Sequence, residues 1–265
     1  MDKKLDNKQI TCYIHTMKLD DWKDPWPNPI IEQYDNINVL RDDLLGYGSK
    51  VRFLDYFVKS LPSTIKEIVY CSPATGYAQI SLPVVCKRYG KKAIIFSAER
   101  DVNKLHDYQK RGISAGAEYK WIKYGRLSVT TSHSKKYINE NPHERIALPL
   151  GLEHPTVLSS IIKVARECIK FKPSEIWTVV GSGTINRGLQ LAFPDVPVHA
   201  VQVGHKLTER ELGRAKLWVS PYKFNIPVKQ EDAPPFPSAP TYDAKAWSFI
   251  KEHSKPQSLF WNIGG

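Results

Sequence analysis

The sequence lacks any long apolar run. No window of its 265 residues approaches the roughly 18 apolar residues that a membrane-spanning helix needs. Residues 1–17 carry charge but no apolar core of the kind found in secretory signal peptides. We therefore expect no membrane partner and no export, and a cytoplasmic location.

Paired cysteines and metal-ligand spacings are also missing. The chain has four cysteines, and no two of them form a C-x-x-C pair. They are typical of buried or free thiols in a reducing compartment rather than of disulfides or a zinc site. The histidines show no metal spacing either, and we predict no metal site. The cysteines are Cys12, Cys71, Cys86 and Cys168.

Acidic residues are few relative to basic ones. Lysine and arginine number 38 against 27 aspartates and glutamates, which gives a net charge of +11. This excess favours a polyanionic partner such as nucleic acid, although an anionic cofactor and substrate would also suit it. The content of 42% hydrophobic and 25% charged residues is that of a globular protein.

Short apolar runs alternate with helical patterns along the chain. Residues 66–71, 92–99 and a run starting at Tyr119 have the composition of buried parallel strands, and helical segments separate them. Strand–helix–strand repeats at this spacing predict an α/β fold with parallel sheets flanked by helices. Residues 1–36 and 124–147 show no clear period and are expected to be irregular, as is most of the proline-rich tail.

Lys50 stands at the start of one such helix. Apolar residues from Phe53 to Leu61 follow at the helical period, which fixes this helix to a core. At a helix N-terminus the dipole disfavours the ammonium form of lysine. A neutral amine is what a lysine needs in order to attack a carbonyl carbon, so Lys50 is our candidate catalytic residue.

A turn of small residues follows the apolar strand 175–180. Gly181, Ser182, Gly183 and Thr184 lead directly into a helix, and backbone N–H groups at such a turn can hold a phosphate. The turn has no Gly-Lys-Ser/Thr of a P-loop and does not fit the dinucleotide fingerprint. A plain strand–helix turn is the alternative.

A second loop lies at the carboxyl end of strand 66–71. It contains Ser72, Thr75, Gly76 and Tyr77. Open α/β sheets bind ligands at the carboxyl ends of their strands, so this loop is our candidate for substrate binding. An ordinary connecting loop explains the same residues equally well.

Taken together and in order, these stretches resemble the fold-type-II pyridoxal phosphate (PLP) enzymes, nearest the branch of 1-aminocyclopropane-1-carboxylate (ACC) deaminase and D-cysteine desulfhydrase. The matching stretches are LRDDLLGYGSKVRFLDYF, PATGYAQ, VVGSGTINRGL and FWNIGG. The resemblance implies that Lys50 holds PLP as a Schiff base and that residues 181–184 bind its phosphate. It also implies two α/β domains with the cofactor in the cleft: a large domain of residues 1–51 and 149–265, and a smaller, mobile one of residues 52–148. Homodimers are common among these relatives.

Two positions depart from the pattern of the family. Gly76 stands where the family has an asparagine that touches the cofactor and the substrate carboxylate. Ile263 stands where a threonine faces the pyridine nitrogen, which leaves Asn262 as the nearby polar candidate for the cofactor.

Three functions remain open on the sequence. The first is a PLP-dependent lyase that breaks a bond at Cα of an amino acid carried on a nucleic-acid base, for example a decarboxylase in DNA hypermodification. The second is deamination or desulfhydrase-type elimination on a small free amino acid, as the family resemblance implies. The third is a catalytically inactive relative that binds PLP or nucleic acid.

Overall fold

The computed structural model describes Leu19 and residues 21–265, and its described part forms two compact units. One unit contains the chain up to Phe53 together with Pro155–Gly265, and the other contains Leu54–His154. The predicted domain boundaries, at 51/52 and 148/149, stay a prediction. Residues 1–17 and Cys12 lie outside the described residues. Within the described part, no helix has the length and apolarity required to cross a bilayer.

The large unit is built on a six-stranded sheet with the order β1-β2-β10-β7-β8-β9. Every neighbouring pair is parallel except β1–β2, an antiparallel hairpin whose turn residues Asp35 and Asn36 both have positive φ. The expectation of an irregular entry over residues 1–36 is therefore wrong for residues 31–36, which form β1 and the turn of this hairpin. The strands are β1 (Ile31–Tyr34), β2 (Ile37–Arg41), β7 (Ile176–Val180), β8 (Val198–Gln202), β9 (Lys216–Val219) and β10 (Ser258–Asn262).

The last strand, β10, lies between β2 and β7, so residues far apart in the chain become neighbours. Phe260 pairs in register with Val39 on one side and with Trp177 on the other. All five residues of β10 and all five of β7 are buried, and apolar side chains form most of both strands. The sheet therefore places the end of β10 beside the strand that leads to Lys50.

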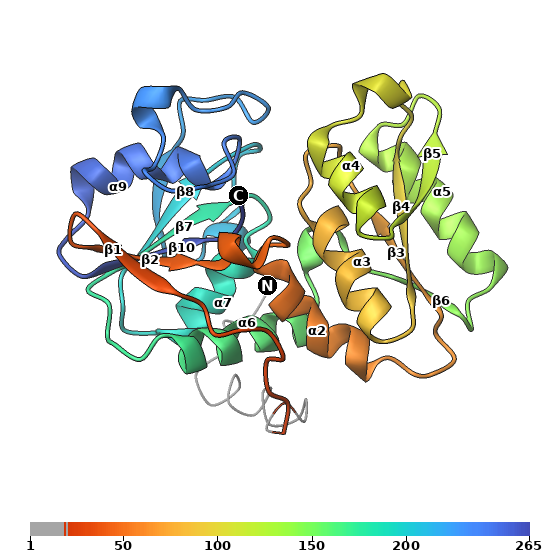
Figure 1. Ribbon diagram of the computed structural model, residues 1–265, viewed down its shortest axis with the longest axis horizontal. Helices are drawn as coiled ribbons and strands as arrows, with labels where there is room; N and C mark the ends of the chain where they lie inside the picture. The colour runs from red at the N-terminus through yellow and green to blue at the C-terminus, as the bar shows by residue number, and fades with distance from the viewer. Residues whose placement is uncertain (1–18, 20) are drawn as a thin grey trace. The chain divides into compact units, whose positions relative to one another are not determined.

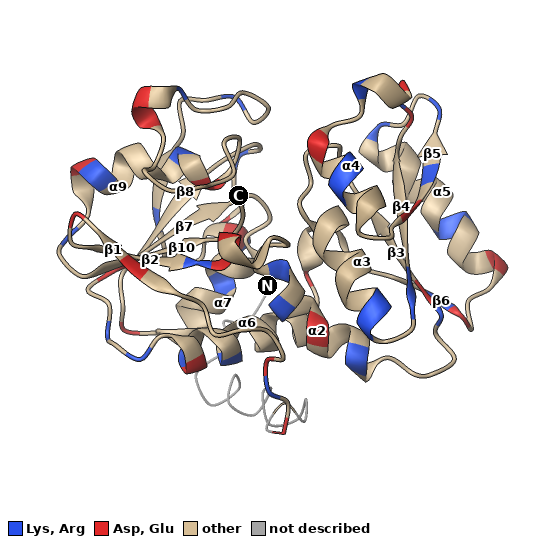
Figure 2. Cartoon of the chain, viewed as in Figure 1, with Lys and Arg blue, Asp and Glu red and all other residues tan. Residues whose placement is uncertain are grey.

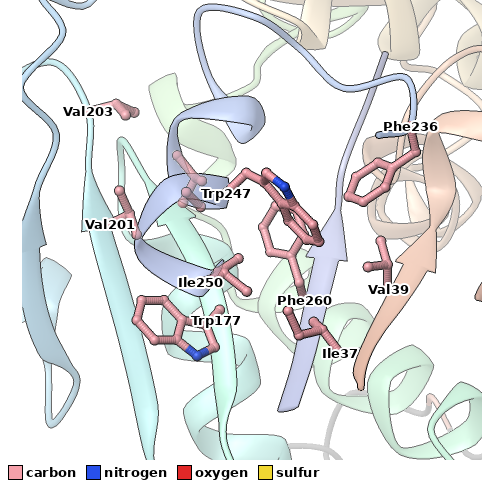
Figure 3. Packing of buried hydrophobic residues seen from close by; sticks show 11 residues of the cluster. Ile37, Val39, Trp177, Val201, Val203, Phe236, Trp247, Ile250 and Phe260 are labelled. Atoms are coloured by element: carbon pink, nitrogen blue, oxygen red, sulfur yellow. The ribbon is translucent and has the colours of Figure 1, made fainter. Parts of the chain in front are cut away.

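One face of the large sheet packs against helix α9 (Trp247–His253). Figure 3 shows the indole of Trp247 and the side chain of Ile250 from this helix beside Phe260 and Trp177 of the sheet. Helices α6 (Pro155–Cys168) and α7 (Thr184–Ala192) pack against each other and lie below the sheet in the view of Figure 1, whereas α9 lies above it. The core cluster consists of Ile37, Val39, Trp177, Val179, Val201, Val203, Phe236, Ala246, Trp247, Ile250 and Phe260.

The small unit is built on a four-stranded, fully parallel sheet with the order β5-β4-β3-β6. Its strands and helices alternate as the sequence predicted, and the predicted α/β class with parallel sheets is confirmed. In Figure 1, α3 and α4 lie on one face of this sheet and α5 on the other. The elements are β3 (Glu67–Cys71), α3 (Ala78–Arg88), β4 (Lys92–Ala98), α4 (Asp107–Ser114), β5 (Glu118–Ile122), α5 (Leu127–Glu140) and β6 (Arg145–Ala147).

The prediction that residues 124–147 are irregular is wrong, because they contain α5 and β6. Helix α5 fully buries only Thr130 and Ser134, so it presents no apolar stripe that a periodicity argument could detect.

Helix α2 (Lys50–Ser60) begins at Lys50, as predicted, and its apolar stripe is buried. The remaining short elements are η1 (Asp42–Leu45), η2 (Val102–Lys104), η3 (Leu150–Leu152), α8 (Glu209–Leu212), η4 (Gln230–Asp232) and η5 (Asp243–Ala246).

Candidate active site

Lys50 is held by the end of the central strand. The residue before it, Ser49, donates its backbone N–H to the carbonyl oxygen of Ile263 at 2.8 Å, directly after β10. The Lys50 side chain is half-buried, and burial lowers the pKa of its amine, whereas the charge of Asp243 opposes this shift. The structure therefore favours the neutral amine for which the sequence argued.

Asp243 is the buried partner of this lysine, and the sequence analysis missed it. The residue opens η5 and is 2% exposed. Burial raises the pKa of its carboxyl to about 7, and the charge of Lys50 opposes that rise. Its Oδ2 accepts the N–H of Gly264 at 3.2 Å, while Oδ1 is buried without a hydrogen-bond partner among the described residues. No motif marks Asp243, because it lies in the proline-rich tail.

Burial favours the uncharged form of both Asp243 and Lys50. It pushes the carboxyl of Asp243 towards its protonated form and the amine of Lys50 towards its unprotonated form. A carboxyl of raised pKa that interacts with a lysine of lowered pKa marks a candidate functional site.

The turn after β7 has the geometry of an anion cradle. Gly183 has φ +77 and caps the N-terminus of α7, so the helix that begins at Thr184 directs its first N–H groups towards this turn. A Cβ on Gly183 would lie 2.7 Å from the Cα of Glu211, so glycine is required here. The Ser182 Oγ lies 3.4 Å from the Thr184 Oγ1. Two hydroxyls and helical N–H groups therefore gather at this turn.

Tyr242 connects the turn to the lysine. Its hydroxyl accepts a hydrogen bond from the backbone of Gly181, and a Cβ on Gly181 would lie 3.0 Å from this oxygen. Burial raises the pKa of Tyr242, so the hydroxyl stays protonated. Because Tyr242 and Asp243 are consecutive, one short segment contacts the turn with one residue and acts on Lys50 with the next.

Asn262 is bound on all sides by the protein. Its side-chain amide donates to Asp43 Oδ1 and to the carbonyl oxygen of Pro237, both at 2.7 Å, and its Oδ1 accepts the hydroxyl of Ser238 at 2.8 Å. The side chain is fully buried. The assignment of Asn262 as a cofactor contact stays a prediction, and this geometry favours a structural role instead.

The charged run before Lys50 forms a buried network. Arg41 makes two hydrogen bonds to Asp43, at 2.9 and 2.8 Å. Arg52, which is fully buried, donates to Asp42 Oδ1 at 2.9 Å, and Asp42 Oδ2 accepts the indole N–H of Trp261 at 2.9 Å. These residues fix the start of α2 against β10, so the motif around Lys50 serves to position the lysine.

The candidate substrate loop follows β3 in the small unit. Ser72 is buried and donates its hydroxyl to the carbonyl oxygen of Pro73 at 3.0 Å, and Thr75 is half-buried. At Gly76 a Cβ would lie 2.6 Å from the Ser72 Oγ and 3.2 Å from the Pro73 carbonyl oxygen. The loop thus closes on itself and leaves no room for a side chain at residue 76.

Gln79 holds this loop from the first turn of α3. Its amide lies 2.9 Å from the Ala74 carbonyl oxygen and 2.6 Å from that of Gly76, and its Oε1 accepts the hydroxyl of Tyr119 at 2.8 Å. Tyr77 accepts a hydrogen bond from Arg111 Nη2 at 2.9 Å. The loop is therefore rigid, and its role in substrate binding stays a prediction.

Comparison with known proteins places this geometry in a context. No family model matches the sequence. A curated relative, the "Glycyl-dTMP PLP-dependent decarboxylase" of Pseudomonas phage M6, is 25% identical over 268 residues, which cover 86% of this chain and 94% of the relative.

Solved structures match the fold over almost its whole length. An ACC deaminase homologue superposes with a TM-score of 0.77 at 17% identity, covering 95% of this chain and 94% of its own. A T.th. threonine deaminase has a TM-score of 0.68 at 15% identity, covering 96% and 97%. Serine racemase from Dictyostelium discoideum has a TM-score of 0.67 at 15% identity, covering 98% of both chains.

Proposed function

We propose that this chain, a PLP-dependent enzyme of fold type II, is a decarboxylase that acts on an amino acid attached to a nucleic-acid base. The fold type and the cofactor predicted from the sequence are confirmed. The observation that carries the reaction is the buried pair of Lys50 and Asp243. The phage relative, named for glycyl-dTMP, supports the base-linked substrate.

The residues of the large unit fit the cofactor. Lys50 offers a neutral amine for its aldehyde carbon, and the turn from Gly181 to Thr184 offers N–H groups and hydroxyls for its phosphate. The unpartnered Oδ1 of Asp243 offers an acceptor for the ring nitrogen. The side chain of Asn262 is engaged within the protein, because its amide donates to Asp43 and Pro237 and its oxygen accepts from Ser238. Bound PLP supplies a sink for the electrons of the bond that is broken.

Lys50 then acts as the proton carrier of the reaction. Burial lowers the pKa of its amine, which makes the neutral form easier to reach and suits delivery of a proton to the substrate Cα after loss of CO2. The Tyr242 hydroxyl stays protonated beside Gly181, so it adds no charge next to the phosphate site. These features support a role for Lys50 and Asp243 in holding the proton of the reaction.

The substrate loop supports loss of CO2 rather than retention of the carboxylate. Gly76 replaces the asparagine that the family resemblance led us to expect, and a Cβ at this position would displace the Ser72 hydroxyl. The loop therefore offers the substrate carboxylate no amide at this position. A carboxylate left in a poorly solvated site is raised in energy, which favours its departure as neutral CO2.

A second candidate is deamination or elimination on a small free amino acid. The structural neighbours support it, because two of them are a deaminase and a deaminase homologue. The inactive alternative predicts no turnover at all. The homodimer, nucleic-acid binding and the cytoplasmic location remain predictions that accompany the proposal.

The test is spectroscopic first and chemical second. Purified protein with PLP should show a band at roughly 410–430 nm, which Lys50→Ala removes and which Lys59→Ala, an exposed lysine at the other end of α2, leaves unchanged. The protein should then release CO2 from a glycine-bearing thymine nucleotide. Release of ammonia from free amino acids without CO2 from the nucleotide would favour the second candidate instead. No band in the wild type would refute the assignment of Lys50.

A further inference from the structure

An aromatic side chain stands exposed at the tip of the loop between β5 and α5. Tyr124 is 87% exposed, and its backbone has φ +57. The next residue, Gly125, is packed tightly, because a Cβ there would lie 2.9 Å from the Ile122 carbonyl oxygen and 3.1 Å from the Cα of Ala98. The loop is thus anchored at Gly125 and presents the tyrosine ring to solvent.

This conformation opposes two ordinary preferences. A left-handed backbone is an outlier for a bulky residue, and strain of this kind is found mainly at functional sites. A large ring in water also forgoes the free energy of burial. Stacking of the ring on a flat partner would offset both costs, and every nucleic-acid base has a flat face for such stacking.

The charges around Tyr124 suit a polyanion. Residues 119–139 contain five lysines and arginines and no acidic residue, and all five are exposed. Lys123 lies over the Tyr124 ring, with its Nζ 5.7 Å from the centroid. Neither Lys123 nor Arg126 pairs with a carboxylate in the described part of the chain. Figure 2 shows the basic positions along β5, its following loop and α5.

The loop also lies on the edge of the small sheet where a substrate would be expected. Because β3, β4 and β5 are parallel, residues 123–126 leave the sheet at the same edge as the substrate loop 72–77. The two loops are two strands apart, roughly 10 Å at about 4.8 Å per strand. A strand of a few nucleotides spans that distance, at about 3.4 Å per nucleotide in a stacked duplex strand.

We propose that the loop Lys123–Arg126 binds the nucleic-acid strand next to the base that carries the amino acid. Tyr124 stacks on a neighbouring unpaired base, and Lys123 and Arg126 contact the phosphates. The loop therefore favours a single-stranded or locally opened polynucleotide over a free nucleotide as substrate, and in a duplex the base must leave the stack to react. This inference rests on the proposed function and defines its substrate class.

Binding of a fluorescent single-stranded 12-mer, followed by anisotropy over a series of salt concentrations, tests the loop directly. Lys123→Gln with Arg126→Gln should lower the slope of log K against log salt by about 1.4, at about 0.7 for each phosphate on single strands. The matched control, Lys59→Gln with Lys87→Gln, removes two exposed charges of the same unit and should leave the slope unchanged.

The stacking contact is tested with Tyr124→Asn and Tyr124→Phe. Asparagine tolerates a left-handed backbone but has no ring, so it should weaken binding roughly 5- to 150-fold, which corresponds to about 1–3 kcal/mol for each stacked base. Phenylalanine keeps the ring and should bind like the wild type. Equal binding by Tyr124→Asn and the wild type, or a change in oligomeric state without a change in binding, would overturn the inference.

Turnover separates this inference from the proposed function. If both are right, the loop variants release CO2 from the mononucleotide as fast as the wild type but lose turnover of the oligonucleotide at low concentration. If the loop variants turn over the oligonucleotide as fast as the wild type, the inference is wrong and the proposed function stands. If binding depends on the loop while neither substrate releases CO2, the loop is confirmed and the proposed function is wrong.

Discussion

Replacement of Asn262 by alanine distinguishes a structural residue from a cofactor contact. The wild-type side chain makes three hydrogen bonds within the protein, to Asp43, Pro237 and Ser238, and is fully buried. Alanine would remove all three bonds, and of the three partner groups in the described part of the chain only the Asp43 carboxylate would keep other hydrogen bonds, its two from Arg41. We therefore expect the protein without cofactor to lose stability, which a residue that only touches the cofactor would not cause.

The magnitude follows from the three bonds. The bond to the Asp43 carboxylate is of the charged type, worth about 1.5–3 kcal/mol, and each of the two neutral bonds is worth about 1 kcal/mol. The sum is roughly 3–5 kcal/mol, a large part of the 5–15 kcal/mol by which proteins are usually stable. With an m-value of about 3 kcal/mol/M, the urea midpoint should fall by about 1–1.7 M.

Urea unfolding of the protein without PLP, followed by circular dichroism, measures this fall. Asn38→Ala is the control, since Asn38 lies on the neighbouring strand and makes one weak bond, to the Ser258 carbonyl oxygen at 3.4 Å. Its midpoint should move by a small fraction of that for Asn262→Ala. An unchanged midpoint for Asn262→Ala, together with a loss of PLP affinity, would refute the structural role and restore Asn262 as a cofactor contact.

Three further predictions concern Asp243, Gly183 and Arg52. In the folded protein Asp243 keeps its proton between pH 3.8, the ordinary carboxyl pKa, and about pH 7, so unfolding releases that proton and stability falls as pH rises through this window. Urea unfolding at pH 4, 5.5 and 7 should show the fall. The variant Asp243→Asn should lack it, and Lys50→Ala should move it to higher pH. Gly183→Ala should lower the free energy of unfolding by the usual ~1–2 kcal/mol of a left-handed backbone and by a further steric clash, and it should weaken PLP binding. Gly90→Ala, at φ +64 with open space around the new Cβ, should show the backbone effect alone. Equal losses of stability in the two variants would refute the clash. Arg52→Met leaves buried carboxylates unpaired and should cost about 3–5 kcal/mol in urea unfolding, and a loss below ~1 kcal/mol would contradict the buried network.

The parts of the site that the sequence could predict are those set by neighbours in the chain. The start of α2 at Lys50 and the turn at Gly181–Thr184 depend on glycines and on apolar spacing within about ten residues. Each is visible in one short stretch. Their resemblance to a family then supplied the order in which they occur.

The parts that the sequence could not predict depend on contacts between distant segments. Asp243 reaches Lys50 from a tail that has no period, and its raised pKa comes from burial under residues that only the fold brings there. Asn262 was chosen because it is polar and near the right motif, yet its hydrogen-bond partner Asp43 lies 219 positions away in the chain. Helix α5 was missed because its buried residues are a threonine and a serine.

One segment of the tail, residues 237–246, explains how these distant parts become a single site. Its first residues bind Asn262, its backbone at Ala239 donates to the Gly264 carbonyl oxygen at 2.8 Å, and Tyr242 and Asp243 then meet the turn and the lysine. Because β10 lies in the middle of the large sheet, the segment is held against the most buried strand of the protein. Burial at that position raises the pKa of Asp243 and lowers the pKa of Lys50. The perturbed pKa values of this pair are therefore a consequence of where the last strand inserts.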